Sequence, residues 1–195
     1  MFFKHHVLIA HAAVIAPPVS LAEDARREQR GEPSPMLAAI LQQTALALAL
    51  DHAETRCHRA LDEALTFAVT DETADASAGH GSFCTPAYLE MQRGRCWAQL
   101  GKPGKAIPAF ENALAALPAA YQRDRGVAYA GLAEALLADD QVERAAQAVG
   151  EALTIAQDSG SARIGGMVAA VADGLESHQR SEPVAELFAH LTGEA

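Results

Sequence analysis

The sequence contains few aromatic residues, few cysteines and no long apolar segment. Aromatic residues make up 5% of the 195 residues, and there are three cysteines. Three thiols cannot all pair within one chain, which favours a reducing compartment over a disulfide framework. No alternating run rich in Val, Ile and Thr indicates a β-strand. The apolar stretch Val7–Ala16 is too short to span a bilayer, so we expect no membrane span.

Basic residues are also scarce. The chain has 15 Lys and Arg against 25 Asp and Glu, which gives a formal net charge of −10. A protein that binds nucleic acid needs clustered Lys and Arg to neutralise phosphates. The one basic cluster, Arg26-Arg27 with Arg30, lies among acidic residues and is typical of a solvated helix face. We therefore expect no direct nucleic-acid binding by this chain.

Ala, Leu and Glu dominate, as in helical proteins, and they form a repeating unit at Ala87–Pro118. It reads AYLEMQRGRCWAQLGKPGKAIPAFENALAALP, with Gly94-x2-Trp97 on a first helix and Ala106-x3-Phe110 on a second. This stretch resembles the tetratricopeptide repeat, a helix–turn–helix unit of about 34 residues. Two helices approach closely where a small residue leaves room for a ring from the partner helix. The spacing predicts two antiparallel helices.

The unit recurs with drift on both sides. Leu132, Ala145 and Val149 fill equivalent positions downstream, and Ala119–Arg125 is expected to hold about five extra residues. We predict an all-α fold, a tetratricopeptide-like α-solenoid of antiparallel helix pairs in a single domain. Its segments are a partial N-terminal repeat or signal segment (1–34), a repeat (35–69), a loop (70–86), the best-conforming repeat (87–120), a repeat (121–158) and C-terminal capping helices (159–195).

Two interpretations of the N-terminus remain open. Met1–Ala22 has a short basic start, an apolar stretch and a small-residue site at Ser20-Leu21-Ala22, the outline of a secretory signal. The alternative is the first helix of an upstream repeat, with Val19–Arg30 as its partner helix. The first interpretation predicts an exported helical-repeat protein of envelope or secretion assemblies, and the second predicts a cytoplasmic one.

Signals for catalysis or metal binding are weak. His52, Cys57 and His58 form an H-x4-C-H pattern, but on a helix these side chains would point in different directions. Neither a G-x-S-x-G elbow nor a phosphate-binding loop is present. We expect no catalytic residues, no metal and no cofactor. Cys57 and Cys96 occupy small-residue helix positions, whereas loop residue Cys84 is the thiol expected to react with a probe.

Binding is the remaining function, and repeat geometry predicts where it occurs. In stacked helix pairs the first helices line the concave surface, and their outward residues are available to a ligand. Amide and guanidinium groups suit peptide backbones and carboxylates. The residues selected in this way are Gln42, Gln43, Tyr88, Gln92, Arg95, Gln99 and Glu134.

Ala87–Ala195 resembles the C-terminal repeat region of actinobacterial helix-turn-helix transcriptional regulators. The resemblance is carried by the repeat at Ala87–Pro118 and by the following stretch RDRGVAYAGLAEALLADDQVERAAQAVGEALTIAQDSGSARI. In that family a DNA-binding module precedes a tetratricopeptide-like sensor or dimerisation region. Residues 1–50 contain no basic helix-turn-helix module, so DNA binding is not implied here. The resemblance implies a regulatory domain with a protein or peptide partner, and leaves a homodimer open.

Overall fold

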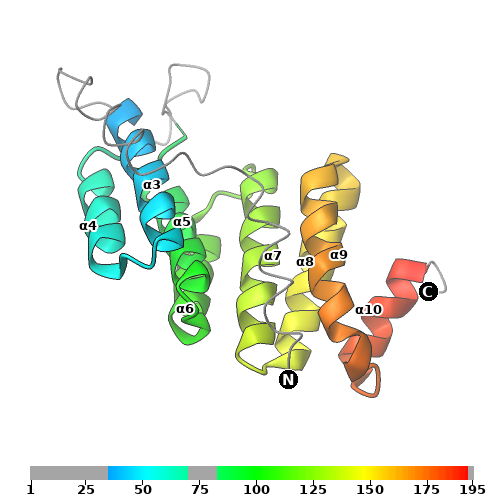
Figure 1. Ribbon diagram of the computed structural model, residues 1–195. Coiled ribbons are helices and arrows are strands. Elements are labelled where there is room, and N and C mark those ends of the chain that lie inside the picture. The colour runs from blue at the N-terminus through cyan, green and yellow to red at the C-terminus, as the bar shows by residue number, and fades with distance from the viewer. Residues whose placement is uncertain (1–34, 70–82, 193–195) are drawn as a thin grey trace. The chain divides into compact units, whose positions relative to one another are not determined.

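The computed structural model describes residues 35–69 and 83–192, and in these ranges the chain is all-helical with no strand (Figure 1). The expectations for Met1–Ala22, and most of the expected 70–86 loop, fall outside the described residues. None of the described helices is long and apolar enough to cross a membrane. The helices are α3 (Pro35–Leu50), α4 (Glu54–Leu65), α5 (Pro86–Gln99), α6 (Pro103–Ala116), α7 (Gln122–Ala138), α8 (Val142–Ser159), α9 (Ala162–Leu175), a 3-10 helix (Glu176–His178) and α10 (Glu182–Thr192).

Each short turn within a helix pair is built in the same way. The α3–α4, α5–α6 and α7–α8 turns contain one residue with left-handed φ: His52 (55°), Gly101 (71°) and Asp140 (59°). The residue after it donates its N–H to a carbonyl five residues earlier. These bonds join Ala53 to Leu48 (2.8 Å), Lys102 to Trp97 (2.9 Å) and Gln141 to Leu136 (2.9 Å). This bond satisfies the exposed carbonyls of a helix end and reverses the chain direction. The recurrence of one turn supports the repeat interpretation.

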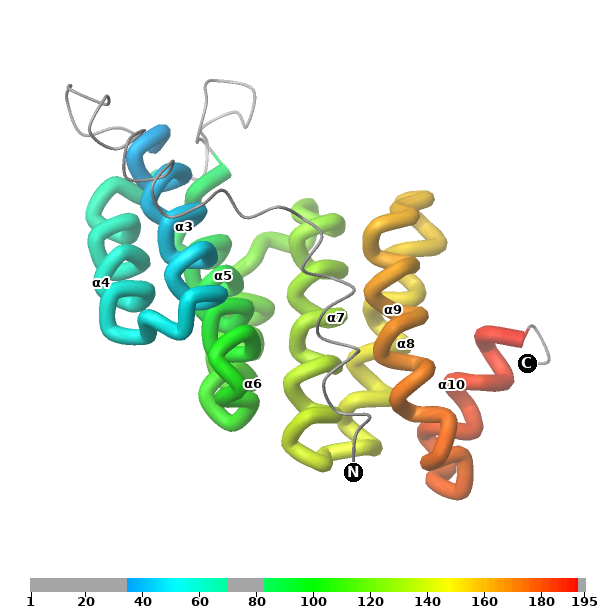
Figure 2. The backbone as a smooth tube through the Cα atoms, in the orientation of Figure 1, coloured from blue at the N-terminus to red at the C-terminus, as the bar shows by residue number. Residues whose placement is uncertain are grey.

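The contacts divide the chain into two compact units, Met1–Gln92 and Arg93–Ala195, with the division inside α5. In the first unit α3 packs along α4 (Figure 2). Their core includes Ala38, Leu41 and Ala64, together with Cys84 and Leu89 from the segment that enters α5.

In the second unit α7 packs against α6, α8 and α9, and α8 also contacts α10. One ring makes the close approach: Phe110 of α6 is fully buried between glycines of two other helices. A Cβ added at Gly94 of α5 would lie 3.0 Å from this ring, and one added at Gly131 of α7 would lie 2.6 Å from it. As expected, a ring from one helix fills the space that small residues leave on its neighbours.

The extra length of the 121–158 repeat is not confined to a connection. Residues 122–125 form the first turn of α7, which has 17 residues, and α8 has 18, whereas α5 and α6 each have 14. The expectation that Ala119–Arg125 holds the extra residues as a connection is therefore partly wrong, because α7 begins at Gln122. Arg125 explains the helical start: it donates hydrogen bonds to the carbonyls of Leu114 (2.9 Å) and Leu117 (3.1 Å). The guanidinium thus supplies a donor to carbonyl groups at the C-terminal end of α6 that have no partner within the helix, and it holds α7 beside that end.

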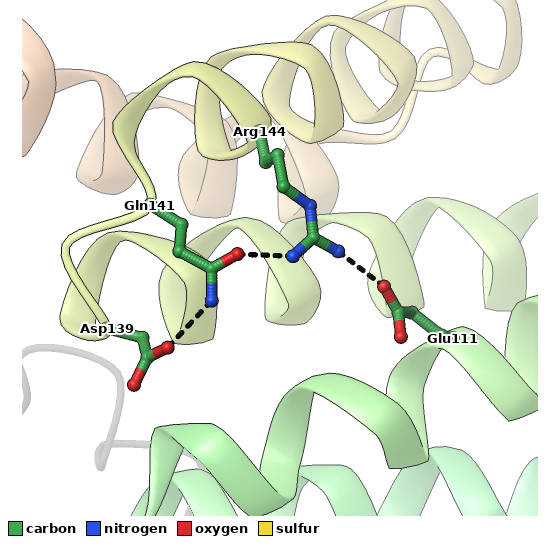
Figure 3. A network of polar contacts seen from close by, with 4 residues as sticks. All are labelled: Glu111, Asp139, Gln141 and Arg144. Carbon is green, nitrogen blue, oxygen red and sulfur yellow. Dashed lines mark hydrogen bonds and ion pairs between the residues drawn. The ribbon is translucent and has the colours of Figure 1, made fainter.

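Polar contacts join α6 to the turn between α7 and α8 (Figure 3). Arg144 at the start of α8 pairs with Glu111 of α6 and donates to Gln141, and Gln141 donates to Asp139 at 2.7 Å. The Arg144 and Glu111 side chains are about half exposed. Exposed ion pairs stabilise weakly, so this network orients the turn more than it stabilises the core.

Candidate binding surfaces

The residues expected to contact a ligand differ in exposure. On α3, Gln43 is exposed, but Gln42 is only 1% exposed and accepts a hydrogen bond of 3.1 Å from the Gln43 side-chain amide. On α5, Gln92 is only 2% exposed. These two glutamines therefore do not lie on a solvated face, contrary to expectation. Their helical spacing is the reason: Gln42 follows buried Ala38 by four residues, and Gln92 follows buried Leu89 by three.

The other expected residues are partly accessible. Tyr88 packs edge-to-face against Phe83, with ring centroids 5.2 Å apart. Arg95 and Gln99 on α5 and Glu134 on α7 are half-buried. Tyr88 belongs to the first compact unit, whereas Arg95, Gln99 and Glu134 belong to the second. Their contact with a ligand stays a prediction.

The cysteine expectations had mixed outcomes. Cys57 and Cys96 are buried, as predicted for packing residues. Cys84 is also fully buried, and burial raises the pKa of its thiol to about 12. The expectation of a reactive loop thiol is therefore wrong. Cys84 belongs to the core cluster of the first unit, and its carbonyl accepts a hydrogen bond of 3.0 Å from the Val69 N–H.

The H-x4-C-H pattern does not lie on one helix. His52 is exposed in the α3–α4 turn, while Cys57 is buried in α4 and His58 is half-buried. Among the described residues no group of three or more His, Cys, Asp or Glu could hold a metal ion.

A groove that the sequence did not indicate lies between α8 and α10, within the second unit. Its volume is about 450 Å³. The buried part of its lining consists of small and apolar residues, and the exposed part carries amide, hydroxyl, carboxyl and imidazole groups. The residues that line it are Ala146, Gln147, Gly150, Leu153, Thr154, Gln157, Pro183, Glu186, Leu187 and His190. Gly150, a glycine in the middle of a helix, is a local irregularity in the sequence, but it does not indicate which helix lies opposite it, since an added Cβ there would meet no atom within 4 Å.

The helices and turns together define an all-α protein of adjacent helix pairs, compatible with a tetratricopeptide-like fold. Comparison with known proteins found no matching family model, no matching curated protein and no matching solved structure. The fold assignment therefore depends on the repeated turn and on the packing of Phe110.

Proposed function

We propose that this chain is a non-catalytic helical-repeat scaffold that binds a protein or peptide, as the regulatory part of a transcriptional-regulator-like protein. The observation that carries the proposal is the repeated helix pair, with the same turn at His52, Gly101 and Asp140. Stacked helix pairs expose long helical surfaces and are widely used for recognition. The regulatory role follows only from the resemblance of Ala87–Ala195 to regulator repeat regions.

The residues proposed to contact this partner are the accessible part of the expected set, on the first helix of each pair. Each compact unit contributes its own: Gln43 and Tyr88 in the first unit, and Arg95, Gln99 and Glu134 in the second. Amide and guanidinium groups can donate to peptide carbonyls and carboxylates, and a half-exposed tyrosine offers an apolar ring with a polar tip. The absence of a matching catalytic motif in the sequence is consistent with binding without chemistry.

The test is capture of a partner from extract of the native cell by the full chain, followed by mass spectrometry. Gln43→Arg and Gln99→Arg each place a large cation among the proposed contact residues, one in each unit, and Gln122→Arg adds the same charge at an exposed position outside them. We expect a partner that the wild-type chain and Gln122→Arg capture and that the first two variants lose. Capture of no specific protein, or equal capture by all variants with unchanged circular dichroism spectra, would contradict the proposal.

A further inference from the structure

The groove between α8 and α10 has an apolar base with room above it. Ala146 and Leu187 are buried at 2% and 5% exposure, and Leu153 is half-buried. A Cβ added at Gly150 would meet no atom within 4 Å, so the space beyond this backbone is open. A channel between two helices, with an apolar base and polar edges, suits the apolar face of a third helix.

The two helices that form the groove are acidic. They carry Glu143, Glu151, Asp158, Glu182 and Glu186, against Arg144, which pairs with Glu111 of α6, and His190, which lines the groove. Glu151 and Glu186 are exposed, and Glu186 lines the groove itself. An occupant with positive charge at its edges would complement this field, and one with negative charge would be repelled.

The same charge disfavours a second copy of this chain in the groove. A symmetric dimer through this face would bring the carboxylates of one copy against those of the other. The net charge of −10 adds a general repulsion between two copies.

From these observations we infer that the α8–α10 groove binds a basic amphipathic helix of a protein partner. Apolar side chains at positions i, i+3, i+4 and i+7 of that helix contact Ala146, Leu153 and Leu187. Its Lys and Arg side chains lie near Glu151 and Glu186. This inference rests on the proposed scaffold function and adds a second surface with a defined partner chemistry.

The test uses the full chain and a synthetic Leu/Lys peptide of about 18 residues, or five helical turns, with Leu on one face. Fluorescence anisotropy of the labelled peptide reports binding. Gly150→Leu fills the groove, and Gly166→Leu is its matched control, because Gly166 is an exposed glycine in α9 whose added Cβ also meets no atom within 4 Å. We expect micromolar binding that weakens about tenfold or more in Gly150→Leu and is unchanged in Gly166→Leu, a difference of about 1.4 kcal/mol.

Charge is tested separately. Glu186→Lys should weaken binding of the Leu/Lys peptide, and a peptide with Glu in place of Lys should not bind. Equal binding to Gly150→Leu and Gly166→Leu, or equal binding of both peptides, would overturn the inference, as would a dimer of the wild-type chain that Gly150→Leu dissociates.

The failure of the groove and the failure of the scaffold function can be told apart. If Gly150→Leu binds the peptide normally while Gln43→Arg and Gln99→Arg still lose the captured partner, the groove assignment fails and the scaffold function stands. If no partner is captured, the scaffold function fails whatever the peptide does.

Discussion

Phe110 shows at the residue scale how this chain holds its helices together. The ring is fully buried, with Gly94 on one side and Gly131 on another, and a methyl group at either glycine would meet it at 3.0 Å or less. Because the ring lies against the backbone of both glycines, it cannot move away from one without approaching the other. Small residues at these two positions are therefore a packing requirement.

Gly131→Ala tests this requirement. Alanine favours a helix more than glycine does, so a gain is expected wherever space exists. At Gly131 the added Cβ would lie 2.6 Å from Phe110, and we expect a loss of about 1–3 kcal/mol in the free energy of unfolding through overpacking. Gly150→Ala is the control, with a gain of up to about 1 kcal/mol, since nothing lies within 4 Å of its Cβ. Urea denaturation that ranks the two variants in the opposite order would contradict this account.

Cys84 gives a prediction about reactivity and pH. The folded-state pKa of about 12 lies above the ordinary thiol value of 9.0, because burial disfavours the thiolate. The folded chain keeps this proton longer than the unfolded chain, so its contribution to stability is present below about pH 9 and is lost as the pH rises toward 12. We expect no labelling of Cys84 by a thiol reagent near pH 7.5 and rapid labelling in denaturant. Mass spectrometry of the labelled peptide reads this directly, and fast labelling of Cys84 in the folded chain would show that it is accessible.

At the element scale, the helix pairs depend on a turn that needs one left-handed residue. Glycine adopts that conformation without steric cost, as Gly101 does, but His52 and Asp140 carry side chains that disfavour it. The same N–H to carbonyl hydrogen bond closes each turn. The helix pair therefore imposes the left-handed conformation on His52 and Asp140.

His52→Gly should therefore stabilise the α3–α4 pair by about 0.5–1 kcal/mol. The control is Asp51→Gly at the neighbouring exposed position, which does not have a positive φ. There the added backbone freedom of the unfolded chain should leave stability unchanged or lower. Thermal unfolding followed by circular dichroism compares the two, and a lower midpoint for His52→Gly than for Asp51→Gly would contradict the proposed role of the turn.

At the scale of the whole molecule, the excess of acidic residues governs which partners can approach. A chain with formal charge −10 repels phosphates and attracts basic surfaces. The same excess is found locally on α8 and α10, where it defines the partner inferred for the groove.

We therefore expect no specific affinity of the isolated chain for duplex DNA at physiological salt. Binding to DNA depends on counterions released when basic groups neutralise phosphates, and this chain has too few basic residues to do so. Titration of labelled duplexes in about 0.15 M salt is the measurement. A saturable, sequence-dependent shift at submicromolar concentration would contradict the expectation and would place a DNA-binding element within this chain.

The helix pairs could be predicted from sequence because their determinants are local. Periodic small and apolar residues at Ala87–Pro118 indicated the helix pair of α5 and α6, and α9 and α10 lie in the segment 159–195 where capping helices were expected. The contact of Gly94 with Phe110 was also predictable, because the repeat places a small residue on the first helix and a ring on the second, where the two helices approach closely.

The tertiary structure alone decided which polar and thiol groups are buried. Gln42, Gln92 and Cys84 looked like surface or loop residues. Helical spacing puts Gln42 on the face of Ala38 and Gln92 on the face of Leu89, but whether that face is covered depends on the packing of other segments. The groove between α8 and α10 was equally invisible, since its two walls come from residues 146–157 and 183–190. A helical pattern states which residues share a face, but only the packing of several helices determines which faces are covered.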